Sequence, residues 1–377
     1  MSLNFKFSLV IVLVLLVPLS GCKKGCTDMT ATNYDEKAKR DDGSCLHGSF
    51  DKKEMLKSIG ENVIIPAYTT IQLNVSNLEA SVSSFTSNPD SSHLVDLRLA
   101  FKQTYLAWQA ATPFEFGPAA DVTLRSNLNT FPTDTTKIEN NVSNGSYNLA
   151  TASNLSTKGF PAIDYLINGD SITNVVALFS SSNRVNYLKD VTDDIESLVD
   201  GVTNEWSLSS GNYLNIFSNN DGVDVGSSLG LLVNELNRDF ELIKNIKIGI
   251  PLGKKTLGTP FPGKTEAFYG SFSVELALSN VESIEASFKV ENGLYDYLDF
   301  LGATHQNDLL SEKIKNQFAD AKSALKLVSD PLSNAVINDS DQVNNAYDEL
   351  QKLVVLLKVD MPSAVGTLIT YQDNDGD

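Results

Sequence analysis

Residues 185–206 read VNYLKDVTDDIESLVDGVTNEW, and this stretch decides the expected fold. Its apolar side chains recur at helical intervals, and they are Val185, Leu188, Ile195, Leu198, Val202 and Trp206. This spacing places them on one face of an α-helix, with charged and polar side chains on the opposite face. A helix of this kind gains stability by packing its apolar face against other helices.

The same periodicity recurs along most of the chain. Similar apolar stripes run through residues 55–85, 94–108, 225–243, 268–284, 314–325 and 343–354, and Pro66 is expected to kink the first of them. Sustained strand-like alternation is scarce. The sequence therefore predicts an all-α protein of two packed helical bundles. A break rich in Asn, Ser and Gly around Ser209–Gly222 separates the predicted halves, at about residues 50–210 and 220–377.

The N-terminus predicts export. Lys6 precedes the apolar run FSLVIVLVLLVPLS, which has the length of a secretory signal and is short for a membrane span. The run ends at Leu19-Ser20-Gly21-Cys22, which resembles a bacterial lipobox. We expect residues 1–21 to be a lipoprotein signal peptide and Cys22 to be acylated, with the mature protein on the outer membrane, on either face. The alternatives are an ordinary signal peptide and an uncleaved anchor.

The cysteines predict a small disulfide-closed segment after the lipid-anchored residue. Cys26 and Cys45 remain when Cys22 is assigned to the anchor, and two spare cysteines in an exported protein favour a disulfide. The segment between them resembles a Cys-loop module of exported Bacteroidetes proteins. Its acidic residues could surround Ca²⁺, but their spacing departs from the EF-hand pattern. Residues 22–49 are therefore expected to form a spacer.

Charge and motifs exclude several function classes. The formal net charge of −18 disfavours nucleic acid as a partner. Gly258–Thr265 matches the phosphate-binding pattern G-x-x-x-x-G-K-T, yet Pro260 and Pro262 remove two backbone N–H groups that such a loop needs. No nucleotide is expected. The three histidines, His47, His93 and His305, are isolated, and neither H-E-x-x-H nor G-x-S-x-G occurs.

A series of sequence blocks carries a family resemblance. In chain order they include LRLAFKQTYLAWQAATPFEFGPAAD (97–121), LNTFPTDTTKIE (128–139), KGFPAIDYLI (158–167), IGIPLGK (248–254), EAFYGSFSVEL (266–276) and GLYDYLDFLGA (293–303). In this order they resemble the imelysin family, exported helical proteins described as peptidases and linked to iron uptake. The resemblance covers residues 50–377 and implies two packed helical bundles.

The resemblance also points to one candidate site. The family signature is Gly-x-His-x-x-Glu, whose histidine and glutamate are proposed metal ligands. Here Gly159 keeps its place, Pro161 replaces the histidine, and Asp164 replaces the glutamate. Proline neither binds a metal nor transfers a proton, but it suits the start of a helix. We expect Asp164 in the first turn of that helix, near the loop Glu115–Pro118, as a cap, a surface charge or an oxygen ligand for a metal.

These features favour a non-catalytic, membrane-anchored binding or accessory protein of iron or metal acquisition. Iron or another metal ion is the cofactor that the family implies, and a TonB-dependent receptor or a haem protein is the implied partner. One alternative is an imelysin-type metallopeptidase that uses carboxylates and His305. The other is a structural, partner-binding lipoprotein with a degenerate site.

Overall fold

The computed structural model describes residues 23–29, 31, 34–45 and 48–371. The expected leader and Cys22 lie outside the described residues. The chain divides into two compact units, one ending at Phe50 and the other beginning at Asp51. Among the described helices, none combines the length and the apolar composition needed to cross a bilayer.

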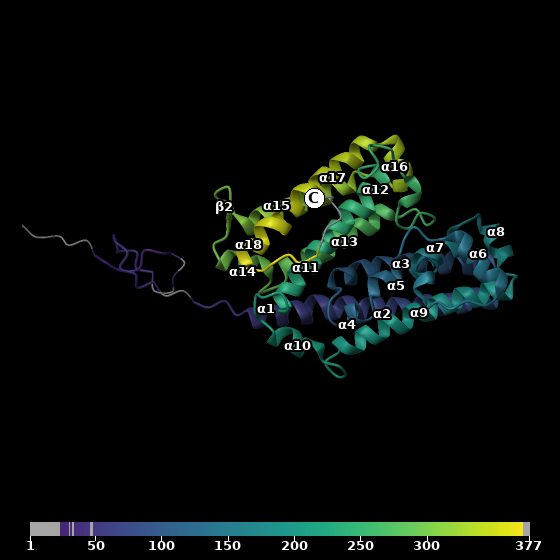
Figure 1. Cartoon of the computed structure of the whole chain (residues 1–377), viewed down its shortest axis with the longest axis horizontal. Helices are drawn as coiled ribbons and strands as arrows, with labels where there is room; N and C mark the ends of the chain where they lie inside the picture. Colours follow the sequence, from purple (N-terminus) through teal and green to yellow (C-terminus); the bar gives the residue numbers. More distant parts are fainter. Residues whose placement is uncertain (1–22, 30, 32–33, 46–47, 372–377) are drawn as a thin grey trace, which may run out of the picture. The chain divides into compact units, whose positions relative to one another are not determined.

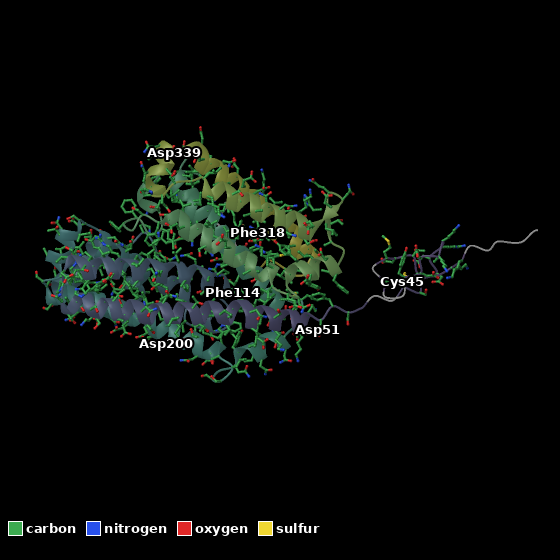
Figure 2. The ribbon with its side chains drawn as sticks, turned by 180° about the vertical axis from the view of Figure 1, so that it is seen from behind. Cys45, Asp51, Phe114, Asp200, Phe318 and Asp339 are labelled. Atoms are coloured by element: carbon green, nitrogen blue, oxygen red, sulfur yellow. A yellow bond between two sulfur atoms is a disulfide. The ribbon has the colours of Figure 1, made fainter. Side chains whose placement is uncertain are left out.

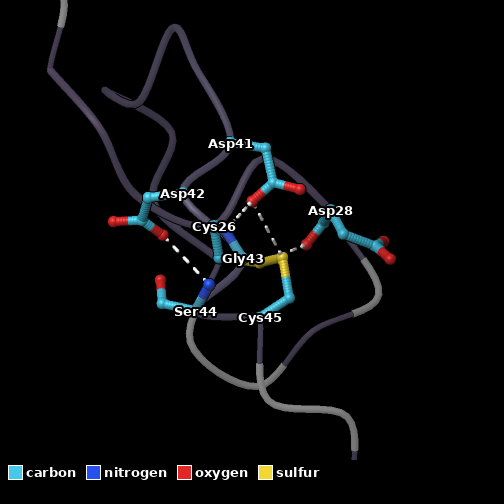
Figure 3. Close-up of a disulfide and its surroundings, with 7 residues drawn as sticks. All are labelled: Cys26, Asp28, Asp41, Asp42, Gly43, Ser44 and Cys45. Atoms are coloured by element: carbon cyan, nitrogen blue, oxygen red, sulfur yellow. Dashed lines mark hydrogen bonds between the residues drawn. A yellow bond between two sulfur atoms is a disulfide. The ribbon is translucent and has the colours of Figure 1, made fainter.

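The N-terminal unit is a small, irregular segment held by the expected disulfide between Cys26 and Cys45 (Figure 3). Two isolated bridges, Lys24 with Arg40 and Cys26 with Tyr34, supply its β-type pairing. Its acidic side chains bind its own backbone. Asp41 and Asp42 accept hydrogen bonds from the N–H groups of Gly43 and Ser44, each at 3.0 Å.

The second unit is almost entirely helical, as expected, and begins with a bundle around three long helices. In Figure 1, α2, α3 and α9 lie side by side, and α2 contacts both of the others. In chain order the elements are α1 (Lys52–Ile59), the π-helical turn η1 (Gly60–Ile64), α2 (Ile65–Ser87), α3 (Ser91–Ala111), the 3₁₀ turn η2 (Thr112–Phe114), α4 (Pro118–Asp121), α5 (Leu124–Leu128), α6 (Thr135–Asn144), the 3₁₀ helix η3 (Ala152–Thr157), α7 (Gly159–Asn168), α8 (Ile172–Leu178), α9 (Ser182–Trp206) and α10 (Tyr213–Asn219).

A second bundle follows, in which α15 contacts both α13 and α17. Its elements are α11 (Ser228–Glu241), the π-helical η4 (Leu242–Gly249), α12 (Ile250–Leu252), the 3₁₀ turn η5 (Pro262–Lys264), α13 (Ser273–Lys289), α14 (Leu294–Phe300), the two-residue strands β1 (Thr304–His305) and β2 (Asp308–Leu309), α15 (Leu310–Lys326), α16 (Leu332–Asn338), α17 (Ser340–Val355), the π-helical turn η6 (Leu356–Asp360) and α18 (Met361–Val365). The two bundles pack through α3 and α13.

Each bundle has an aromatic core, marked in Figure 2 by Phe114 and Phe318. Both side chains are fully buried. Phe114 meets Phe116 edge-on, with ring centroids 6.4 Å apart, whereas Phe318 meets Phe288 at 5.5 Å. Separate aromatic clusters of this kind are consistent with two bundles that each have their own hydrophobic centre.

The break expected around Ser209–Gly222 is not a plain linker. It contains α10, which packs against α1 at the start of the first bundle. The sequence prediction missed this short helix because the segment is rich in Asn, Ser and Gly. Its Leu214 and Phe217 are buried. Two predicted stripe residues, Val225 and Phe268, lie outside helices and are partly exposed.

The expected disturbance at Pro66 is a π-helical turn rather than a simple kink. Proline has no N–H and its ring clashes with the carbonyl four residues earlier, so the preceding turn widens. The N–H of Ile65 accordingly bonds the carbonyl of Gly60, five residues back. The extra residue shifts the buried face, so Ile64 is buried where the periodicity predicted Val63. Pro251 and Pro362 follow the other π-helical segments in the same way.

Candidate functional site

The signature stretch opens α7, as the sequence predicted. Gly159 begins this helix with a φ of +71°, a conformation that side chains disfavour. A Cβ at this position would also overlap the backbone carbonyl of Leu128. Glycine is therefore required here both by the backbone conformation and by close approach. The preceding Lys158 is buried and its ammonium group lies 3.1 Å from an oxygen of Asp194.

Asp164 lies one turn later than expected. It is the sixth residue of α7, in the second turn, where backbone N–H groups already have helical partners. It therefore does not cap the helix, and it is not a surface charge, because only 1% of the residue is exposed.

The Asp164 carboxylate faces a connection in the second bundle. One oxygen, Oδ2, accepts a hydrogen bond from the backbone N–H of Tyr269 at 2.9 Å, and Oδ1 accepts one from the Asn168 side-chain amide at 3.1 Å. The loop Glu115–Pro118, which was expected nearby, lines a different cavity and supplies neither of these hydrogen bonds. Residues 269–270 are more than a hundred positions away, so helical periodicity alone does not place them here.

Burial dominates the electrostatics of Asp164. Desolvation raises the pKa of its carboxyl group to about 7, although the hydrogen bonds and the positive charge of Arg98 act in the opposite direction. The group therefore titrates near neutral pH instead of remaining a fixed anion.

A cavity of about 210 Å³ lies next to Asp164 and Pro161. Its other lining residues come from two distant segments, and they are Phe131, Pro132, Thr133, Thr135, Gly263, Thr265, Ala267, Phe268 and Tyr269. The phosphate-loop pattern thus contributes Gly263 and Thr265 to this wall, where Thr265 donates its N–H to the carbonyl of Pro262. The signature motif therefore borders a small cavity of mixed polar and apolar lining between the bundles.

A larger cleft lies beside it and was not anticipated from the sequence. A cavity of about 300 Å³ and one of about 440 Å³ share Glu115, Ser126 and Arg238 in their walls. Phe131 lines both the 300 Å³ cavity and the cavity beside Asp164.

A buried ion pair lies behind this cleft. Lys247 lies 3.1 Å from Glu266 Oε2, with side chains only 7% and 1% exposed. The Lys247 ammonium group also donates to Gln109 Oε1 at 2.5 Å and to Asn280 Oδ1 at 2.8 Å. The ammonium group is therefore held inside the protein by one ion pair and two hydrogen bonds.

Comparison with known proteins decides the family. The sequence model of the imelysin family matches residues 64–358, most of the chain. The chain belongs to the imelysin family. No curated protein matches it in sequence.

Two solved structures share the imelysin fold seen here. One is a candidate iron-regulated protein A precursor from Parabacteroides distasonis, with a TM-score of 0.72 and 18% identity. The other is an imelysin-like protein from Psychrobacter arcticum, with a TM-score of 0.66 and 16% identity. Each alignment covers 85% of this chain and 97% of the other. At this identity the likeness establishes the fold.

Neither of the two histidines that the structure describes in this imelysin replaces the missing histidine of the signature. His305 lies in β1, with Nδ1 at 3.3 Å from Asp360 Oδ2, and His93 pairs with Asp90 at 2.9 Å. Neither residue lines the cavity beside Asp164. His47 lies outside the described residues. In the described part of the chain, no group of three His, Cys, Asp or Glu side chains has the arrangement of a metal site.

Proposed function

We propose that this imelysin is a lipid-anchored, non-catalytic binding protein of an iron or metal acquisition system, with its ligand between the two bundles. The observation that carries the proposal is the chemistry at the signature. Pro161 offers no donor where the family has histidine, and Asp164 accepts two hydrogen bonds from the protein.

Hydrolysis needs more than this site offers. A catalytic zinc ion takes about three protein ligands, an open position for water and a base. A carboxylate has about four lone-pair positions, so Asp164 has room for roughly two further contacts and can supply one ligand group to a metal. One oxygen ligand suits the binding of a hard ion such as Fe³⁺ that brings most of its other ligands with it.

The link to iron rests on the family and on a structural relative whose name describes it as iron-regulated. Cell-envelope location rests on the apolar leader and Cys22, and the proposed partners are a TonB-dependent receptor or a haem protein. Co-purification of the membrane-bound protein with a receptor of that class supports this part of the proposal. If no such receptor co-purifies from cells grown under iron limitation, the proposed partner is wrong.

Metal titration tests the binding site. Purified mature protein is titrated calorimetrically with ferric nitrilotriacetate and with Zn²⁺, alongside Asp164→Ala, Pro161→His and the exposed-site control Asp320→Ala. We expect Asp164→Ala to weaken iron binding at unchanged helix content. We expect Pro161→His to raise affinity for zinc or iron by restoring a nitrogen donor. If neither variant differs from Asp320→Ala, Asp164 is a packing residue and the site lies elsewhere.

A protease assay tests the proposal that the protein has no peptidase activity. Casein is incubated with the protein with and without a chelator, and we expect no chelator-sensitive cleavage. Cleavage that the chelator abolishes, and that Asp164→Asn removes, establishes a metallopeptidase instead.

A further inference from the structure

The 300 Å³ cavity carries chemistry that the signature does not use. It lies between α5 with the loop after it on one side, and α11 with η4 on the other. Its volume is at the lower end of small-ligand sites, which range over about 300–1,000 Å³. Both signs of charge and several apolar side chains line it.

The positive side of the cavity has spare donors. Arg125 uses Nη2 on the carbonyl of Thr112 at 2.7 Å and on Glu235 at 3.1 Å, and Nε on the Thr112 hydroxyl at 3.3 Å. Within the described chain, its Nη1 has no hydrogen-bond partner. Arg238 is half exposed and makes a single contact, to Glu235 at 3.4 Å. Two guanidinium groups therefore present free N–H donors, the geometry that carboxylates favour.

The negative side has a spare acceptor. Both oxygens of Glu115 receive the same backbone N–H, that of Arg125, at 2.9 and 3.1 Å. In contrast, each oxygen of Asp239 has a side-chain donor of its own, because Oδ1 accepts from Thr112 at 2.8 Å and Oδ2 from Asn280 at 2.6 Å. Glu115 thus keeps lone pairs for another donor.

Charges of both signs line the cavity. Glu115 and Asp239 supply its carboxylates and Arg125 and Arg238 its guanidinium groups, while the ammonium group of Lys247 is held by Glu266. Desolvation raises the pKa of Glu115 to about 7, and the positive charge of Arg125 acts in the opposite direction. A further cation beside Glu115 would favour its charged form.

Phe131, Leu242 and Ile246 form an apolar part of the wall. We propose that this cavity binds a free L-α-amino acid with an apolar side chain. Its ammonium group meets Glu115, its carboxylate bridges Arg238 and the free Nη1 of Arg125, and its side chain lies against the apolar wall. This ligand supplies one charge of each sign at the two places where partners are missing. The inference goes beyond the proposed function, because it concerns a separate cavity and needs no metal.

Three matched probes test the proposal by calorimetry on the mature protein. L-Leucine carries both charges, isoamylamine lacks the carboxylate and isocaproate lacks the ammonium group. We expect leucine to bind at least about tenfold more tightly than either half-ligand, since each lost charge pair costs of the order of a tenfold change in affinity. Valine, methionine and phenylalanine extend the panel.

Two substitutions assign the ends of the ligand. Glu115→Gln should weaken leucine binding and leave isocaproate unchanged, because it removes the ammonium partner alone. Arg238→Gln should weaken leucine and isocaproate and leave isoamylamine unchanged. Lys315→Gln, on the exposed face of α15, is the control, with circular dichroism as the check of folding. No binding of any of the four amino acids, or equal losses in all three variants, overturns the proposal.

Discussion

The carboxylate of Asp164 accepts the backbone N–H of Tyr269 at 2.9 Å, which ties α7 of the first bundle to the segment that leads into α13 of the second. The position of the last residue of the signature thus links the two bundles by a hydrogen bond here. Because the contact is buried, the protonation state of Asp164 affects folding stability as well as any ligand.

This burial predicts a pH dependence of stability. The folded-state pKa of Asp164 is raised from 3.8 to about 7, so the folded protein binds this proton more tightly than the unfolded chain. The stabilising contribution is complete below about pH 4 and is lost as the pH rises through 7. The full shift corresponds to about 4 kcal/mol.

Asp164→Asn removes that titration. The asparagine oxygen can still accept from Tyr269, and its amide can pair with Asn168. We expect the variant to gain stability relative to the native protein between pH 4 and 8, measured by urea unfolding at several pH values. Glu115 titrates in the same range in both proteins, so the difference between them isolates Asp164. A pH-independent difference would show that burial of Asp164 has no electrostatic consequence.

Gly159 provides a test of the local backbone. Gly159→Ala should destabilise the protein by about 2–4 kcal/mol, through the left-handed φ and the overlap with Leu128. Gly201→Ala is the matched control, because Gly201 lies within α9 with open space around its Cα. It should stabilise by about 0.5–1 kcal/mol. Equal effects of the two substitutions in chemical denaturation would contradict the close approach at Gly159.

The helical architecture and the start of α7 followed from periodicity and from Gly159, because both depend on residues close in sequence. The apolar face of α9 was largely correct, although Val185 and Leu198 are only half-buried while Tyr187 and Val199 are fully buried. The environment of Asp164 could not be predicted in this way, since the backbone group that binds it across the bundles belongs to Tyr269, 105 positions away in the sequence.

One feature of the sequence does indicate the polar network beside the larger cleft. Asp239 and Lys247 extend the apolar series of α11 and η4 and are both buried. A charged residue on the core-facing side of a helix needs a buried partner. That signal predicts a polar network but not its members, because Gln109, Glu266 and Asn280 come from three other segments.

Lipidation of Cys22 remains a prediction from the leader sequence, because this residue lies outside the described chain. Cys22→Ser should move the protein from the membrane fraction to the soluble fraction of the cell envelope, as judged by fractionation and immunoblotting. Retention of both proteins in the membrane to the same extent would mean that the leader acts as an uncleaved anchor.

The disulfide should stabilise only the N-terminal unit. It closes a loop of 19 residues in sequence separation, worth roughly 3 kcal/mol in the chain-entropy model. The helical unit from Asp51 onward is compact by itself. Cys26→Ser together with Cys45→Ser should therefore leave the main calorimetric melting transition within about 1 °C, a shift that corresponds to less than about 1 kcal/mol in a unit of this size. A large drop would show that the spacer supports the bundles.

The buried pair Lys247–Glu266 offers the sharpest energetic test of the contact between helical segments. Lys247→Met leaves Glu266 buried without its cation, and we expect a loss of about 3–5 kcal/mol in unfolding free energy. Lys247→Met combined with Glu266→Gln removes both charges, and the remaining amide can still accept from Asn129, so stability should largely return. The matched control is the exposed pair Lys102–Glu275, at 2.6 Å between α3 and α13. Lys102→Gln should cost under about 1 kcal/mol, because solvent screens both charges. If the double variant is no more stable than Lys247→Met alone, the loss comes from altered packing around η4 and not from an unpaired charge on Glu266.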